Sequence, residues 1–329
     1  MRKLKYFLIS SFITILLIIT VPVILISYAL LPYNDIYYSK EYHSYQDPTT
    51  IDIMNVDVDI GNVEINYIPY AIDFSVKIDI EYQLSGILEG TSFSDFFEIK
   101  WDDVGNILNF SIHIKDGINL ETIISQAIIK NINILLQASI SCEINVFVRD
   151  GNVTLETIYG ITLGNIFTNL SSGNIQFRIS YCYINGNITA KVQNGYLQLE
   201  LCNCEYLKNL SWLLSTEKGN VAVNLEHEDN IVSNITGTIS THFGNYRISY
   251  IDRTTEVGAL FILGVNQNDT AIHQQLFESI GFDFNQTSVN GNDVYHVYSN
   301  DFPTSSNYRL NFTMPVGVYE DIYFRNLLN

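Results

Sequence analysis

The chain has 329 residues, and its 35 acidic against 17 basic side chains give a net charge of −18. Such an acidic surface repels phosphate backbones, which excludes DNA and RNA as partners. Hydrophobic residues make up 47% of the chain and charged residues only 16%, a composition that excludes an intrinsically disordered protein.

The first predicted element is a transmembrane helix at residues 6–31. This segment has no charged residue and is long enough to cross a hydrocarbon core of about 30 Å. Basic residues lie before it, within residues 1–5, and none follows until Lys40. The positive-inside rule therefore predicts a cytoplasmic tail at residues 1–5 and an extracellular location for the rest of a single-pass cell-membrane protein.

A cleaved signal peptide is the competing interpretation of this segment. Ser27-Tyr28-Ala29 has the small-x-small pattern of a cleavage site. The apolar run exceeds the roughly 7–15 residues of a typical signal h-region, which favours an uncleaved anchor. The tyrosine-rich residues 32–50 then predict a juxtamembrane stalk.

Residues 51–139 are predicted to form a β-rich N-terminal cap. Apolar residues alternate around residues 51–65, 74–80 and 107–114, as expected for strands with one buried face. Helical spacing within residues 120–128 predicts one short helix, from Leu120, Ile123, Ile124, Ala127 and Ile128.

A repeat of about 22 residues dominates residues 140–253. Glycines open successive rungs at intervals of 22, 22, 24 and 25 residues, at Gly151, Gly173, Gly195, Gly219 and Gly244. Apolar residues alternate after each of these glycines, for example Ile175, Phe177 and Ile179. Two such strands per rung, with Gly-Asn corners, predict a flattened parallel β-solenoid. An antiparallel meander is the alternative. It is disfavoured because the same residue types recur at every second strand.

The corner motifs support a family resemblance. They read Ser171–Ile175 (SSGNI), Asn185–Ile188 (NGNI), Glu217–Val221 (EKGNV) and Phe243–Asn245 (FGN). These motifs resemble the repeated Ser-Gly-Asp-Ile/Val motif of the prokaryotic putative-adhesin β-solenoid domains, and residues 59–65 (DIGNVEI) read similarly. Asn replaces the usual Asp, and Lys208 stands where the pattern has glycine. The resemblance implies a surface-exposed, non-catalytic module and carries over no functional residue.

Residues 254–329 are predicted to be an α+β C-terminal cap, because the ends of a parallel solenoid expose unpaired strands. A short helix is expected at residues 270–280, with Asp269 as N-cap and Gly281 at its end. Strands are expected around Tyr295 and over residues 308–313.

No catalytic, cofactor or metal site is predicted. The densest group of metal-binding side chains is Glu226-His227-Glu228-Asp229, for which a solvated acidic loop is favoured over a calcium or zinc site. Cys182 and Cys204 stand 22 residues apart and should stack on adjacent rungs. A spacing of about 4.8 Å between strands permits a disulfide, and a reduced cysteine ladder is equally consistent with the pattern.

Asn-x-Ser/Thr sequons occur nine times. Three of them, at Asn152, Asn187 and Asn209, lie at predicted corners where stacked amides should bond along a ladder. The sequons predicted to accept glycans are Asn169, Asn234, Asn268 and Asn285.

Two functions are consistent with this organisation. The favoured one is a membrane-anchored, adhesin-like module that binds surface proteins or glycans or has a structural role. Tyr159 and Tyr181, equivalent on adjacent rungs, are its first candidate contacts, although burial under the C-terminal segment is favoured for both. The alternative is a surface carbohydrate-active enzyme, a β-helix lyase or hydrolase, with Glu226, Glu228 and Asp229 as its only local acidic cluster.

Overall fold

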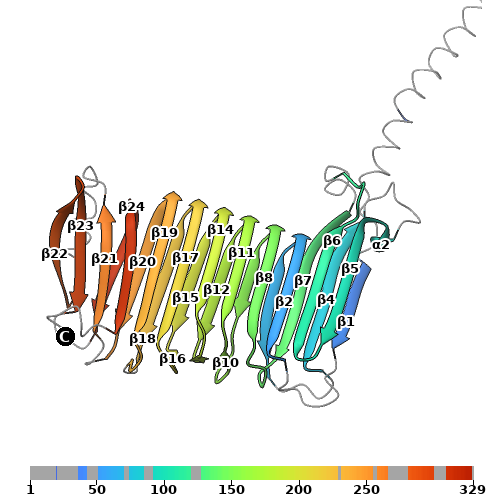
Figure 1. Cartoon of the computed structure of the whole chain (residues 1–329), viewed down its shortest axis with the longest axis horizontal. Helices are drawn as coiled ribbons and strands as arrows, with labels where there is room; N and C mark the ends of the chain where they lie inside the picture. The colour runs from blue at the N-terminus through green and yellow to red at the C-terminus, as the bar shows by residue number, and fades with distance from the viewer. Residues whose placement is uncertain are drawn as a thin grey trace, which may run out of the picture.

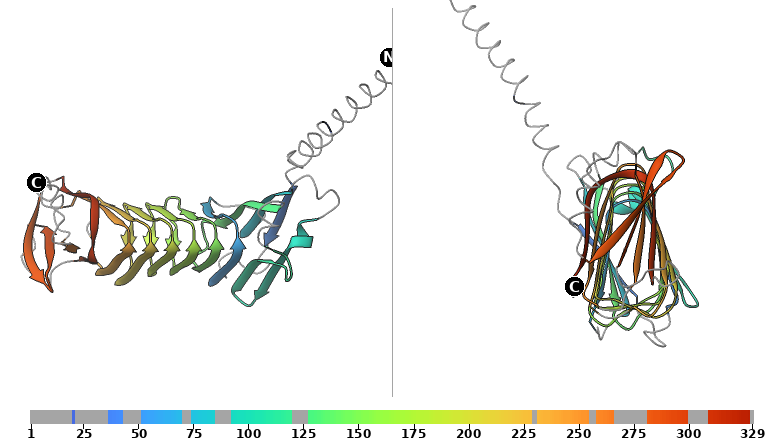
Figure 2. Two further views of the ribbon diagram at one scale, coloured as in Figure 1. Left: turned by 90° about the horizontal axis from the view of Figure 1, so that it is seen from above. Right: turned by 90° about the vertical axis from the view of Figure 1, so that its left-hand side faces the viewer.

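The protein is an elongated, mainly β structure. The computed structural model describes residues 20, 36–42, 51–69, 74–84, 92–119, 127–228, 231–254, 258–265, 281–299 and 309–327. Its strands form one 21-stranded sheet, mostly parallel in its central part, and a small 3-stranded sheet. Figure 1 shows the strands side by side along the long axis, and the end view in Figure 2 shows a flattened cross-section.

The large sheet folds into two faces. The first face contains β2 (Ile53–Ile60), β8 (Glu143–Asp150), β11 (Ile166–Ser172), β14 (Ile188–Asn194), β17 (Leu210–Lys218) and β19 (Ile235–Phe243). The second face contains β3 (Val63–Ile68), β9 (Val153–Glu156), β12 (Ile175–Ser180), β15 (Leu197–Cys202), β18 (Val221–His227) and β20 (Asn245–Asp252). The 3-stranded sheet, β10 (Thr162–Leu163), β13 (Tyr183–Ile184) and β16 (Glu205–Tyr206), lies where the chain returns from the second face to the first.

Each coil pairs in parallel with the next one along the chain. Ile166 of β11 lies opposite Ile188 of β14, and Ile175 of β12 lies opposite Leu197 of β15. Both pairs are 22 residues apart, which confirms the predicted repeat and the predicted parallel pairing. The antiparallel alternative is therefore wrong for these strands.

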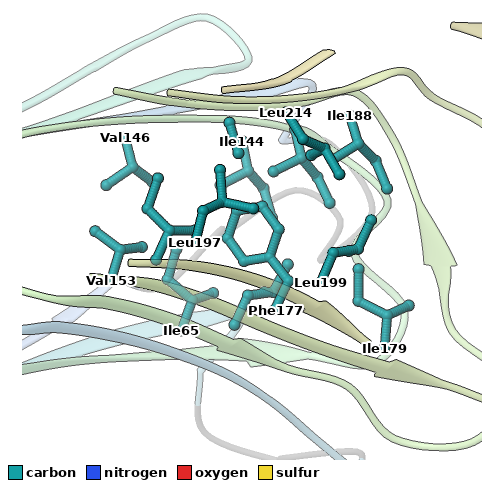
Figure 3. Packing of buried hydrophobic residues seen from close by; sticks show 14 of the residues in the cluster. Ile65, Ile144, Val146, Val153, Phe177, Ile179, Ile188, Leu197, Leu199 and Leu214 are labelled. Carbon is teal, nitrogen blue, oxygen red and sulfur yellow. The ribbon is translucent and has the colours of Figure 1, made fainter. Parts of the chain in front are cut away.

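The core is a continuous column between the two faces. Alternating residues of the stacked parallel strands, such as β12 and β15, point inward, as period-2 alternation requires. In Figure 3, Ile144 and Leu214 of the first face approach Phe177 and Leu199 of the second. All four side chains are buried, and Phe177 is only 1% exposed. Apolar surface buried along the whole stack stabilises the fold.

The N-terminal end inserts an early segment into the stack. Strands β2 and β3 pair in parallel with β8 and β9, so residues 51–68 form a further coil within the region predicted as cap. On their other side lie β6 (Ile107–Ile114) and β7 (Ala127–Gln137). Antiparallel strands β1 (Ile36–Tyr42), β4 (Val76–Leu84) and β5 (Phe97–Val104), with the one-turn helix α2 (Phe93–Phe96), complete this end.

The last described strand contributes to both faces at the C-terminal end of the stack. Strand β24 (Leu310–Asn326) crosses both faces, because its first residues pair with β19 and its later residues pair with β20. Strand β21 (Ala259–Val265) pairs with the other side of β24, followed by antiparallel β23 (Asn292–Ser299) and β22 (Phe282–Val289). The strands expected around Tyr295 and over residues 308–313 are β23 and the start of β24.

Neither of the two predicted helices is observed among the described residues. Ala127 and Ile128 begin β7, so the helix predicted to include them is wrong there, and β-branched residues of this segment fit the sheet. The helix expected at residues 270–280 lies outside the described residues. So does the segment predicted to cross the membrane, except Thr20, and within the described part of the chain no helix is long and apolar enough to do so.

The glycine corners are the tightest points of the stack. Gly151, Gly173, Gly195 and Gly219 all have positive φ, and a Cβ on Gly173 would lie 1.6 Å from the carbonyl oxygen of Gly151. A side chain is excluded at these positions both by backbone conformation and by contact. At the other corner, Lys208 is accommodated because the coil is two residues longer there and β17 starts earlier than β14.

We predict that Gly173→Ala destabilises the fold by at least about 3 kcal/mol, because strain and a backbone clash add. Gly105→Ala is the matched control, since Gly105 has φ +67° but nothing lies within 4 Å of its Cβ position. The control should cost about 1–2 kcal/mol, the strain alone. Urea unfolding measures both, and equal losses for the two variants would contradict the close approach at the corner.

Candidate functional site

Asparagine ladders follow the glycine corners. The Asn152 Oδ1 atom accepts hydrogen bonds from the backbone nitrogen and the Nδ2 atom of Asn174, at 3.0 and 2.9 Å. Asn62 makes the same pair of bonds with Asn152, at 3.1 and 2.9 Å. The predicted amide ladder is therefore confirmed at this corner, and it occupies the Asn152 side chain.

The ladder at the other corner also involves sequons. Asn187 Oδ1 accepts a bond from the backbone of Ser211 at 2.8 Å, and Asn209 Oδ1 accepts one from the backbone of Asn234 at 2.9 Å. Asn234 Oδ1 in turn accepts a bond from Arg309 at 3.0 Å. Asn234, which the sequence separates from the corner asparagines, therefore also bonds to a corner asparagine, Asn209.

The other predicted glycan acceptors differ in position. Asn169 on β11 and Asn285 on β22 are both exposed. Asn268 lies outside the described residues. Exposure makes Asn169 and Asn285 accessible to modification, so their glycosylation remains a prediction.

Tyr159 and Tyr181 form an exposed aromatic pair at the return corner between the second face and the small sheet. Tyr159 is 83% exposed and Tyr181 49%, with ring centroids 6.4 Å apart. The expectation that the C-terminal segment would bury them is wrong, because that segment packs at the end of the stack instead.

The acidic cluster converges on one arginine. Arg253 Nε lies 2.9 Å from Glu226 Oε1 and 3.9 Å from Glu228 Oε1. Glu226 also borders a shallow hollow of about 190 Å³ with Glu200 and Cys202. Asp229 lies outside the described residues. Within the part of the chain that the structure describes, no three His, Cys, Asp or Glu side chains are placed to hold a metal ion.

His227 does not belong to this acidic surface. The side chain points into the core, is 1% exposed, and lies between the rings of Tyr206 and Tyr250, whose centroids are 5.7 and 5.9 Å away. Burial lowers the pKa of His227 to about 3. The imidazole is therefore neutral at physiological pH.

Cys182 and Cys204 stack as predicted for adjacent coils. Their Sγ atoms are 3.6 Å apart and both side chains are buried as free thiols. The hydrogen bond to Cys204, with burial, raises the pKa of Cys182. Burial raises the pKa of Cys142 to about 12 and that of Cys202 to about 11. The thiols of Cys142, Cys182 and Cys202 are therefore poor nucleophiles at neutral pH, because the thiolate is the reactive form, whereas the hydrogen bond from Cys182 lowers the pKa of Cys204.

A larger hollow, about 420 Å³, lies on the outer surface of the first face and was not predicted from the sequence. It is lined by Asn55 and Asp57 of β2, Asn109 and Ser111 of β6, and Phe147 of β8. In register, Asp57 lies between Ser111 and Phe147. Alternation marks Asp57 as outward-facing, but only tertiary pairing brings β6 and β8 to either side of β2.

The chain matches no protein-family model and no curated protein sequence. Among solved structures it is similar to a putative cell adhesion protein from Clostridium sporogenes, with 13% identity and a TM-score of 0.33 over 89% of this chain and 100% of the other. It is also similar to a putative adhesin from Bacteroides fragilis, with 11% identity and a TM-score of 0.34 over 89% of this chain and 97% of the other. Similarity at this level assigns no function.

We predict a pH dependence of stability that originates at His227. Below pH 6.5 the unfolded chain protonates this imidazole, whereas the folded chain does so only near pH 3. The unfolded state therefore binds more protons in that window, and stability falls by up to about 1.4 kcal/mol for each pH unit from 6.5 toward 3.

Urea unfolding of the wild type and of His227→Phe at several pH values between 7 and 4 measures this term. Carboxylates contribute equally to both proteins, so the difference between their stabilities isolates His227. His242→Phe, the same substitution at an exposed histidine, is the control for the change of side chain. A wild-type minus His227→Phe difference that is constant with pH would contradict the prediction.

Proposed function

We propose that the protein is a non-catalytic, adhesin-like module that binds partners at the cell surface through its outer faces. The observation that carries this proposal is the exposed pair Tyr159 and Tyr181 on a repeated backbone. Large, stiff aromatic side chains with a polar tip are enriched in binding surfaces, and ordering them costs little conformational entropy.

The scaffold suits such a role. The parallel β-solenoid stacks coil on coil, and corner asparagines bond neighbouring coils, as Asn152 does with Asn62 and with Asn174. A rigid support keeps exposed side chains in fixed positions, which lowers the entropy that binding must overcome. An elongated shape would also hold its far end away from an anchoring surface (Figure 2).

Membrane anchoring through residues 6–31 is the second part of the proposal. It is supported by the uncharged apolar run and the basic residues before it. The remaining chain would lie outside the cell as a single-pass extracellular domain.

Protease added to intact cells that produce the full chain tests this topology. We expect removal of the bulk of the chain and survival of a fragment of about the first 40 residues, in accordance with the charge asymmetry. Lysed cells treated in parallel provide the control for protease activity. Protection of the whole chain in intact cells, with digestion after lysis, would refute the extracellular location.

The carbohydrate-active enzyme is the less favoured function. Arg253 Nε lies 2.9 Å from Glu226 Oε1 and 3.9 Å from Glu228 Oε1, so a surface ion-pair cluster accounts for these carboxylates without a catalytic role. Sugar release from polysaccharide, abolished by Glu228→Gln, would favour the enzyme instead.

Adherence of cells that display the full chain tests the binding function. The double variant Tyr159→Ser/Tyr181→Ser should lower the number of adhering cells severalfold, because the aromatic contact surface is lost. Phe243→Ser is the matched control, since Phe243 is 62% exposed at another corner. Equal adherence of the double variant and the wild type, at equal surface display, would remove the tyrosine pair from the proposal.

A further inference from the structure

The 420 Å³ hollow on the first face offers unused hydrogen-bonding capacity. The Nδ2 atom of Asn55 donates to Asn109 Oδ1 at 2.8 Å, which leaves the amide nitrogen of Asn109 without a partner among the described residues. The Ser111 hydroxyl, in the next outward position of the same strand, also makes no hydrogen bond within the described residues. The Asn109 amide nitrogen, a donor, and the Ser111 hydroxyl, which both donates and accepts, therefore line one side of the hollow.

Carboxylates supply further acceptors. Asp57 lies in register with Ser111, and its Oδ2 atom is 3.8 Å from His113 Nε2. Asp102 of β5 lies opposite Asn109 and also lines the hollow. Lys100 of the same strand also lines the hollow, and its Nζ atom is paired with Glu98 Oε2 at 3.1 Å. The acidic side chains disfavour an anionic ligand, as does the net charge of the chain.

An aromatic ring lines the opposite side. Phe147 is 40% exposed, and its centroid is 5.4 Å from that of Phe167 on the adjacent coil. Packing against Phe167 restricts the Phe147 ring while leaving part of it open to a ligand. The hollow therefore combines an apolar ring with donors and acceptors at fixed strand spacing.

We propose that this hollow binds a sugar residue of a neutral glycan. A pyranose has C–H groups that can pack on an aromatic ring, and each of its hydroxyls both donates and accepts hydrogen bonds. Asp57 and Asp102 accept from hydroxyls, while the Asn109 amide and Ser111 donate to them. The volume is in the range of small-molecule sites, roughly 300–1,000 Å³. The proposal rests on the adhesin-like function and adds to it a ligand class at a second surface.

Binding of the full chain to immobilised hexasaccharides tests the proposal. The probes are hexamers of glucose, mannose and N-acetylglucosamine, with hexagalacturonate as the acidic comparison. Production in a host without N-glycosylation keeps the sequons at Asn109 and Asn169 unmodified. We expect at least one neutral hexamer to bind, with about tenfold weaker binding by Phe147→Thr and by Asp57→Asn, and no binding of hexagalacturonate.

Phe243→Thr is the matched control for an exposed aromatic residue and should bind like the wild type. Urea midpoints verify that each variant folds. If Phe147→Thr does not fold, Asp57→Asn still tests the hollow independently. Lack of neutral-sugar binding, preference for hexagalacturonate, or wild-type affinity of the folded hollow variants would overturn the proposal. The Tyr159→Ser/Tyr181→Ser variant should bind sugar like the wild type. If that variant loses adherence while the wild type binds no sugar, the sugar site is refuted and the adhesin-like function is not.

Discussion

The close approach of backbones at the Gly-Asn corners is the constraint on which the rest of the structure depends. Parallel coils stack at about 4.8 Å only if the chain turns sharply at the same place in each coil. Glycine permits both the positive φ and the contact with the preceding carbonyl oxygen. Asn62, Asn152 and Asn174, which follow three of these glycines, then bond to one another between neighbouring coils. Together these residues fix the register, and the register decides which side chains enter the core.

Coil length and core composition change together along the stack. Coils of 22 residues enclose mainly aliphatic side chains, whereas the 24-residue coil that begins at Gly195 also buries Tyr206 and Trp212. Aromatic packing continues from Trp212 to Phe312 of β24 and Phe261 of β21, with successive centroids 5.4 and 5.6 Å apart. Close packing of an interior requires that a larger cross-section be filled by larger side chains. His227 belongs to this wider part, where burial keeps it neutral.

Both ends of the stack are completed by segments distant in sequence. Strands β2 and β3 come early in the sequence. Nevertheless β2 lies between β6 and β8, and β3 lies between β7 and β9. At the other end, the first residues of β24 lie between β19 and β21 and its later residues pair with β20, although β24 is the last of the described strands. Such contacts carry a large loop-closure entropy. The hollow on the first face depends on the same topology, because β6 pairs with β2 and β5 pairs with the other side of β6.

The amino-acid sequence by itself determined the repeat, the parallel coils, the inward residues and the corner ladder. These features depend on local rules, namely period-2 alternation and the conformational freedom of glycine, which act within one coil and its neighbour. Tertiary structure decided the exposure of Tyr159 and Tyr181, the pairing of Glu226 with Arg253, and the hollow beside Asp57 and Phe147. Each of these depends on which distant strand lies alongside, a choice set by long-range packing that alternation within a single strand does not encode.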